Sequence, residues 1–128
     1  MLPEIGSTYS FRKTFSESDV YLYGGIICDS SPWHIDEIYA KNSIFKKRLV
    51  YGMLTGSLFG TIIGRYFQGY IYLSQEVTFT KPVFIGDTVE LKVEILDIDE
   101  RQIISLKGTC YNQDGENVLT GLAKIKQL

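Results

Sequence analysis

The residue pair best suited to chemistry is Asp29 and His34, which lie five positions apart in the segment 28–36. His34 is the only histidine in the sequence, and Pro32 stiffens the loop between the two side chains. Adding water to a carbon–carbon double bond requires a base that takes a proton from the water and an acid that protonates the neighbouring carbon. A carboxylate and an imidazole fit these roles without a metal. The spacing alone leaves another interpretation open, in which Asp29 binds backbone amides of its loop and His34 is simply packed or solvated.

A second candidate group lies at the start of a helix predicted over about residues 52–67. If this helix begins at Gly52, the N–H groups of its first turn have no acceptor within the helix, and the positive end of the helix dipole lies behind them. Such groups suit an oxygen atom that gains negative charge in a transition state. Every helix has an N-terminus, so this signal is weak when taken alone.

Glycines recur every four residues along the same predicted helix and therefore lie on one stripe of its surface. They are Gly52, Gly56, Gly60 and Gly64. Each interior glycine costs about 0.5–1 kcal/mol relative to alanine, so we expect another group to approach the stripe closely. That group is a strand or helix of the same chain, a ligand, or a helix of a partner subunit.

Helical signals also precede the candidate loop. Ser16, with Asp19 at the spacing of a capping box, predicts a helix that runs to about Ile27. Pro32 then predicts a loop over residues 28–36, because proline interrupts a continuous helix.

A short helix over residues 37–42 follows, with Asp36 as its N-cap. An irregular stretch then leads into the longer helix at residue 52. In this interpretation Asp29 and His34 lie on the loop, and Gly52 lies at the start of the longer helix.

From Tyr70 onward the sequence alternates with a period of two, which is typical of strands. The alternating segments cover residues 70–80, 88–98, 102–112 and 118–128, and a further strand is predicted near residues 8–15. The stretch NQDGEN between the last two segments indicates a hairpin. The order of elements predicts an α+β fold with an antiparallel sheet of about five strands around one long helix.

Composition limits the class of protein. The chain has 128 residues, 45% of them hydrophobic and 22% charged, and a formal net charge of −2. These values are ordinary for a soluble globular protein, and we expect residues 1–128 to form a single domain. Positive charges occur singly or in short clusters, so no broad basic face for a nucleic acid is expected.

Membrane and export signals are also weak. The longest nearly uncharged stretch, residues 49–64, is shorter than the roughly 20 residues that span a bilayer. The first ten residues lack the basic start and hydrophobic run of a signal peptide. Cys28 and Cys110 lie far apart and outside any CxxC or Cys/His cluster, so we expect free thiols and a cytoplasmic protein.

The sequence around the candidate pair resembles the MaoC-like dehydratases, and among them the R-specific enoyl-CoA hydratases. Their motif runs approximately Gly-Asp-x-Asn-Pro-x-His-x-Asp, followed by Ala, Phe, an apolar pair and His-Gly-Met-Leu. The matching positions here are Cys28 to Asp36, Ala40, Phe45, Leu49, Val50 and Tyr51 to Leu54. Residues 79–89 are similar to the family segment that leads into the sheet. The resemblance covers nearly the whole chain.

The resemblance implies a hot-dog fold, in which a long sheet wraps the central helix. It also implies a homodimer, or a higher homo-oligomer, with a coenzyme A thioester bound near the subunit interface. Asp29 and His34 match the acid–base pair that holds the water. Gly52 matches the glycine whose N–H faces the thioester carbonyl oxygen. Its neighbours Tyr51 and Met53, and Ser31 in the loop of the acid–base pair, are candidate substrate-binding residues.

Three positions depart from the family pattern. Ser31 stands where asparagine is usual, which shortens one hydrogen-bonding side chain. Tyr51 replaces the histidine before the glycine, and Gly60 replaces a residue that is often small and polar. None of them removes the acid–base pair, and together they leave the substrate and the rate open.

The leading functional hypothesis is interconversion of a trans-2-enoyl-CoA and an (R)-3-hydroxyacyl-CoA. Alternatives are dehydration of another thioester, branched or carried on acyl carrier protein, and a non-catalytic acyl-CoA-binding protein. A hot-dog thioesterase would need a carboxylate on the central helix, and residues 52–64 contain none. We expect no metal and no cofactor, because coenzyme A enters as part of the substrate and one histidine with two carboxylates lacks a zinc ligand set.

Overall fold

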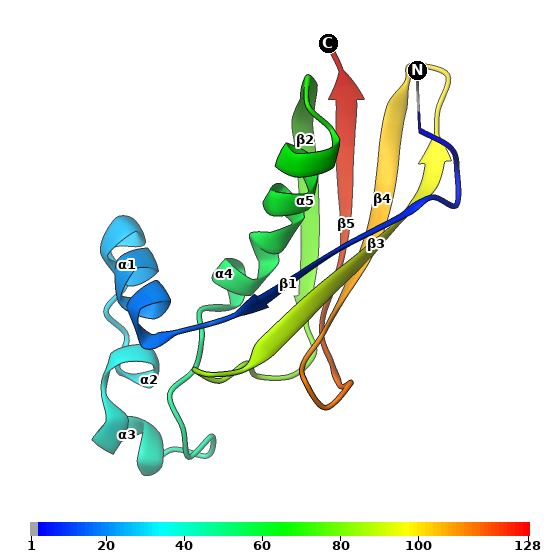
Figure 1. Cartoon of the computed structure of the whole chain (residues 1–128). Coiled ribbons are helices and arrows are strands. Elements are labelled where there is room, and N and C mark those ends of the chain that lie inside the picture. Colours follow the sequence, from blue (N-terminus) through cyan, green and yellow to red (C-terminus); the bar gives the residue numbers. More distant parts are fainter. Residues whose placement is uncertain (1–2) are drawn as a thin grey trace.

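The alternating segments form a five-stranded antiparallel sheet in the computed structural model, which describes residues 3–128 (Figure 1). Its strands are β1 (Thr8–Thr14), β2 (Tyr70–Phe79), β3 (Thr88–Ile98), β4 (Ile103–Tyr111) and β5 (Asn117–Gln127). Their order across the sheet is β1-β3-β4-β5-β2, so β1 and β2 are the two edges. The predicted α+β architecture and the hairpin between β4 and β5 are confirmed.

The alternation buries one face of the sheet. In β3 and β4 every second residue points inward, and Leu91 pairs with Cys110 while Ile95 pairs with Leu106. All four side chains are buried. Period-two patterning therefore turns directly into a hydrophobic surface on which a helix can pack.

The central helix consists of two segments, α4 (Gly52–Gly56) and α5 (Leu58–Tyr66), and lies along one face of the sheet (Figure 1). The prediction of one uninterrupted helix is wrong at Ser57. The N–H of Ser57 donates to the carbonyls of both Met53 and Leu54, and its hydroxyl donates to Leu54 as well. This tightened turn interrupts the regular pattern, but Thr61 N–H still donates to Ser57, so the chain continues in the same helical path.

Phe59 fixes α5 on the sheet. Its ring lies over Gly108 of β4 and Gly121 of β5, which are paired across the two strands. A Cβ atom on Gly108 would approach the ring to 2.5 Å, and one on Gly121 to 3.0 Å. The two glycines therefore form a recess for the phenylalanine, which is 1% exposed.

The glycine stripe has two different halves. A Cβ atom on Gly52 would collide with the ring of Phe79, and one on Gly56 would contact Val77 at 3.5 Å. At Gly60 and Gly64 no described atom outside the helix backbone lies within 4 Å of such a Cβ. Side chains from β2 therefore approach the α4 half, as expected, whereas nothing in residues 3–128 explains the glycines of α5.

Helix α1 (Glu17–Ile27) begins as predicted. The Ser16 side chain accepts from the N–H of Asp19, and the Asp19 carboxylate accepts from the N–H of Ser16. This capping box satisfies two N–H groups that the helix itself leaves free. The helix ends at Cys28, whose backbone is left-handed with φ of 58°.

The prediction of a continuous loop over residues 28–36 is wrong in its second half. Pro32 starts α2 (Pro32–Ile35), one turn of helix. Proline is tolerated at the first helical position, because its missing N–H would have no partner there and its φ already suits a helix. Asp36 then caps α3 (Glu37–Lys41) through the N–H of Tyr39, as predicted.

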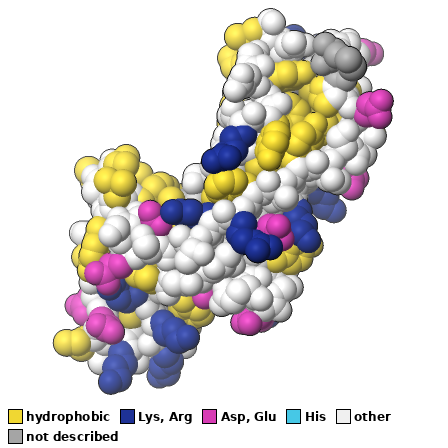
Figure 2. All heavy atoms as spheres, in the orientation of Figure 1, with side chains coloured by type: hydrophobic (Ala, Val, Ile, Leu, Met, Phe, Trp, Pro, Cys, Tyr) yellow, Lys and Arg dark blue, Asp and Glu magenta, His cyan; other side chains and the backbone are white. Residues whose placement is uncertain are grey.

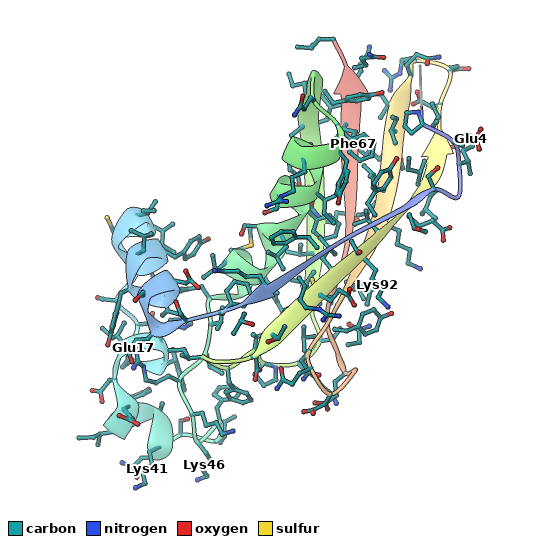
Figure 3. The ribbon with its side chains drawn as sticks, viewed as in Figure 1. Glu4, Glu17, Lys41, Lys46, Phe67 and Lys92 are labelled. Atoms are coloured by element: carbon teal, nitrogen blue, oxygen red, sulfur yellow. The ribbon has the colours of Figure 1, made fainter. Side chains whose placement is uncertain are left out.

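Helices α1, α2 and α3 form a group that stands beside the sheet rather than on it (Figure 1). Hydrophobic side chains gather at the outer end of α1 (Figure 2), where Leu22 and Ile26 are exposed. Lys41 at the end of α3 and Lys46 in the loop after it project outward, whereas Phe67 at the end of α5 lies against Tyr9 of β1 (Figure 3). The candidate residues lie where this group meets α4.

Candidate active site

A cavity of about 550 Å³ lies between the helix group, α4 and the strand ends. It is lined by Tyr23, Ile27, Asp29, His34, Phe45, Leu49, Val50, Tyr51, Gly52, Met53, Thr55, Phe79, Thr80, Lys81, Pro82, Val83, Val118 and Leu119. Five of the six predicted site residues belong to this lining. The sixth, Ser31, lies behind it, against the carboxylate of Asp29.

The backbone of Asp29 is held at both ends. Its N–H donates to the carbonyl of Gly24 at 3.0 Å, because the left-handed Cys28 turns the chain back over the last turn of α1. Its own carbonyl accepts a hydrogen bond from the hydroxyl of Tyr51. The position of Asp29 is therefore set by a helix end and by a residue 22 positions later in the chain.

Ser31 holds the carboxylate of Asp29 in its charged form. Its hydroxyl and its backbone N–H donate to the same oxygen, Oδ1, at 2.6 Å and 2.9 Å. The hydroxyl bond, the N–H bond and then the charge of His34 lower the pKa of Asp29 below its usual value of 3.8, although partial burial opposes them. The carboxylate is thus an acceptor at neutral pH. The shorter side chain at this position, compared with the asparagine of the motif, still reaches Asp29.

His34 is fixed by a backbone carbonyl. Its Nδ1 lies 2.8 Å from the carbonyl oxygen of Leu49. Because a carbonyl only accepts, Nδ1 carries the hydrogen, and Nε2 is the nitrogen left for a ligand in the cavity. The N–H of Leu49 donates back to the carbonyl of Trp33 at 2.9 Å, and Arg48 Nε donates to the carbonyl of His34 at 2.8 Å. These bonds join α2 to the segment before α4.

Tyr51 connects the two candidate catalytic residues. Its ring stacks on the imidazole of His34 with centroids 3.8 Å apart and planes at 24°, while its hydroxyl donates to Asp29. Burial, followed by the negative charge of Asp29, raises the pKa of Tyr51 above its usual value of 10.0. The hydroxyl therefore stays protonated and keeps donating. A residue predicted to form the pocket wall therefore also contacts both candidate catalytic residues.

Gly24 makes room for this arrangement. A Cβ atom at Gly24 would collide with the hydroxyl of Tyr51, and it would lie 3.0 Å from the carbonyl oxygen of Asp29. The hydrogen bond between Tyr51 and Asp29 thus passes over a bare stretch of α1. This explains an interior helix glycine that would otherwise only cost stability.

Gly52 begins α4, as predicted, with Tyr51 as its N-cap. A Cβ atom at Gly52 would lie 2.7 Å from the ring of Phe79, which is itself half exposed. The glycine therefore lets Phe79 close one wall of the cavity beside the first N–H groups of the helix. Met53, also half exposed, contributes to the same lining.

Comparison with known proteins identifies the family to which this chain belongs. The model of the MaoC-like domain family matches residues 2–115, most of the chain. The chain belongs to this family.

Relatives of this MaoC-like chain include hydratases and dehydratases. It is 36% identical over 123 residues to an (R)-specific enoyl-CoA hydratase from Rhodospirillum rubrum, covering 94% of this chain and 85% of the relative. It is 40% identical over 125 residues to the mitochondrial 3-hydroxyacyl-[acyl-carrier-protein] dehydratase FERN from Solanum lycopersicum, covering 95% and 76%. The two relatives differ in the carrier that their names specify.

Among solved structures, the (R)-hydratase from A. caviae involved in PHA biosynthesis superposes with a TM-score of 0.95 at 32% identity. The match covers 98% of each chain. The five-stranded sheet around α4 and α5 is thus the hot-dog fold that the resemblance implied.

Sequence reasoning missed two parts of this MaoC-like site. The carbonyl of Leu49, which fixes the ring of His34, carries no signal, since every residue has a carbonyl. Gly24 carries one, because a glycine inside a capped helix costs free energy and requires a neighbour to explain it. The neighbour, Tyr51, could not be inferred from the sequence alone.

Two negative findings apply to residues 3–128. No cluster of three or more His, Cys, Asp or Glu side chains there could hold a metal ion. Nor does that part of the chain contain a helix long and apolar enough to cross a membrane.

Proposed function

We propose that this chain interconverts trans-2-enoyl-CoA and (R)-3-hydroxyacyl-CoA by adding or removing water. The observation that carries the proposal is that Asp29 and His34 line one cavity and that each leaves an atom for a ligand in it. Asp29 is an ionised acceptor, and His34 offers Nε2 because Nδ1 is bound to a carbonyl. Relatives named as (R)-specific enoyl-CoA hydratases, similar over nearly the whole chain, support the same reaction.

Asp29 and His34 hold the reacting water between them in this proposal. In hydration, the oxygen of the water attacks C3 while Asp29 accepts a proton from the water. Nε2 of protonated His34 delivers a proton to C2. A proton transfer from Asp29 to His34 then restores the pair. Dehydration follows the same steps in reverse.

Negative charge develops on the thioester oxygen when water attacks C3. The N–H groups at the start of α4 support a role for Gly52 in binding that oxygen, since they lie in the cavity wall beside Asp29 and His34. The hydrocarbon part of the acyl chain would contact apolar lining residues such as Met53 and Leu119.

The alternative within the same chemistry is a thioester carried on acyl carrier protein. The 40% identity to a 3-hydroxyacyl-[acyl-carrier-protein] dehydratase supports it. Both carriers present the same acyl thioester, so the acid–base pair serves either one.

The direct test follows the loss of the enoyl-thioester absorbance. Crotonyl-CoA, longer enoyl-CoA substrates and crotonyl-acyl carrier protein should be compared at matched concentrations, and the configuration of the product should be determined. We expect hydration to the (R)-alcohol with the CoA substrates. Turnover of the acyl carrier protein substrate alone would favour the dehydratase alternative. Specific binding of crotonyl-CoA without turnover would favour the binding protein.

We also propose a homodimer, formed at the β2 edge of the sheet. Ile71, Tyr72 and Leu73 on this strand are exposed, and Phe79 at its end lines the cavity. An exposed apolar edge strand is a template for pairing with a second copy, and two-fold symmetry is the commonest arrangement. Sedimentation at micromolar concentration should give at least twice the monomer mass of 14.6 kDa. A pure monomer would contradict the proposal.

Catalysis without a metal or a redox cofactor is part of the proposal, because the acid–base pair by itself supplies the required proton transfers. Activity should survive prolonged treatment with a chelator. Inactivation that a specific metal reverses would contradict it.

A cytoplasmic location is likewise a proposal, supported by the free thiols Cys28 and Cys110. Fractionation of cells that express the tagged protein would test it.

A further inference from the structure

One residue of the cavity wall carries a buried polar atom that has no partner within residues 3–128. Thr55 is 1% exposed, and its hydroxyl oxygen forms no hydrogen bond with any part of the chain that the structure describes. Buried hydroxyls are normally paired, because an unpaired one loses its water without compensation. This atom therefore requires an explanation.

The usual partner of a helical threonine is already occupied. A threonine hydroxyl commonly bonds the carbonyl four residues earlier, which here is that of Tyr51. That carbonyl already accepts from the N–H of Leu54 at 3.0 Å and from the N–H of Thr55 at 3.2 Å. Its two lone pairs are thus used by the backbone, and the hydroxyl is left for another acceptor.

Thr55 belongs to the same wall as the candidate catalytic groups. Thr55 lines the cavity together with Asp29 and His34. It follows Gly52 by three positions, so the two lie on one face of the helix, and side chains on a helix lean toward its N-terminus. Thr55 therefore leans toward the turn that begins at Gly52. Val118 and Leu119, from β5, also line the cavity and offer no side-chain acceptor.

We propose that the Thr55 hydroxyl donates a hydrogen bond to the thioester carbonyl oxygen of the bound substrate. The inference rests on the proposed function and deepens it. An unbranched enoyl chain has no polar atom beyond its thioester, and the hydroxyl formed at C3 faces Asp29 and His34. The carbonyl oxygen is therefore the acyl acceptor that remains, and its negative charge grows in the transition state. Thr55 acts mainly on turnover for this reason.

Two substitutions separate the effect of the Thr55 hydroxyl from the effect of the side chain's shape. Thr55→Val keeps the shape and removes the hydroxyl, whereas Thr55→Ser keeps the hydroxyl and removes a methyl group. We expect Thr55→Val to lower kcat on crotonyl-CoA by about 10–100-fold with a much smaller change in KM, and Thr55→Ser to stay within about threefold of the unsubstituted protein. Thr55→Ala is the substitute if the valine variant does not fold.

Stability is the second measurement. Because the hydroxyl is unpaired in the free protein, Thr55→Val should raise Tm by roughly 3–5 °C while it lowers kcat. A purely structural hydroxyl bond would give the opposite sign, a lower Tm with unchanged kcat in the folded variant. That result would overturn the proposal. So would equal losses of kcat in the valine and serine variants, or a loss that grows with acyl-chain length.

Binding of butyryl-CoA separates this proposal from the proposed function. The saturated thioester carries the same carbonyl oxygen but cannot be hydrated, so its affinity depends on binding alone. Thr55→Val should weaken its binding severalfold in calorimetry, even if the unsubstituted protein fails to hydrate crotonyl-CoA. Unchanged affinity together with unchanged kcat would overturn the role of Thr55 and leave the roles of Asp29 and His34 intact.

Discussion

The two ends of the central helix are built on different principles. At the α5 end, Phe59 fills a recess between paired glycines of β4 and β5, and the contacts are apolar and buried. At the α4 end, Tyr51, Asp29 and His34 are held by hydrogen bonds to backbone groups and by ring stacking beside an open cavity. One end holds the fold together, and the other positions the candidate catalytic groups.

This difference shows that one sequence pattern can run through two different environments. The glycines at four-residue spacing begin beside the ring of Phe79 at Gly52 and end in open space at Gly64. A substitution in the α5 end should therefore change stability, and one in the α4 end should change turnover. The following four predictions test that separation.

The largest effect is expected at the acid–base pair. Asp29→Asn and His34→Ala should each lower kcat by about 10²–10⁴-fold, because each removes one of the two proton-transfer groups. The double variant should be little worse than the worse single variant, since both act on one water. Steady-state kinetics with circular dichroism as a folding control provide the measurement. Near-normal hydration by both folded variants would refute the assignment and favour a binding protein.

The next largest effect is expected in the packed end. Phe59→Ala should lower the free energy of unfolding by about 3–5 kcal/mol, because the recess over Gly108 and Gly121 would be left empty. Phe59→Leu, the matched control, should cost much less. Urea titration gives both values. A folded Phe59→Ala protein with a hundredfold lower kcat would break the separation between the two ends.

A moderate effect is expected where Tyr51 positions Asp29. Tyr51→Phe retains the stacking on His34 but leaves the carbonyl of Asp29 without its donor, so kcat should fall about tenfold with a smaller change in KM. Gly24→Ala should do the same by displacing the tyrosine hydroxyl. In the Tyr51→Phe background, Gly24→Ala should cost less than it does alone, because the hydroxyl it collides with is gone. Strictly additive losses would mean that the two residues act independently.

The smallest effect is expected at the open half of the glycine stripe. Gly60→Ala should raise the free energy of unfolding by about 0.5–1 kcal/mol, since a methyl group there meets no described atom and alanine favours a helix. Gly52→Ala, in the α4 end, is the contrasting variant: its methyl group collides with the cavity-wall residue Phe79, so it should gain no such stability and should lower kcat. Thermal unfolding at several protein concentrations provides the test. Destabilisation by Gly60→Ala together with dissociation of a dimer would indicate that a second copy packs on this stripe.

The sequence determined the features that depend on neighbours along the chain. The capping groups of Ser16 and Asp36 start helices because their partners are three residues away. Alternation produced the five strands, and NQDGEN produced the hairpin, because side-chain period and turn chemistry are local properties. Local rules were incomplete at Pro32, where proline started a helical turn, and at Ser57, where the last turn of α4 tightened.

The candidate site was predicted as a set of residues but not as a geometry. Asp29 and His34 could be selected from their types and spacing. Only the tertiary structure decided that Leu49 fixes the tautomer of His34, that Tyr51 binds Asp29 across the gap left by Gly24, and that the Thr55 hydroxyl is unpaired. Most of these contacts join segments 15 or more positions apart. The unpaired hydroxyl of Thr55 depends on all the surrounding elements, because none of those within residues 3–128 offers it a hydrogen-bond partner. Such contacts follow from how separate elements pack, which no local pattern of residues encodes.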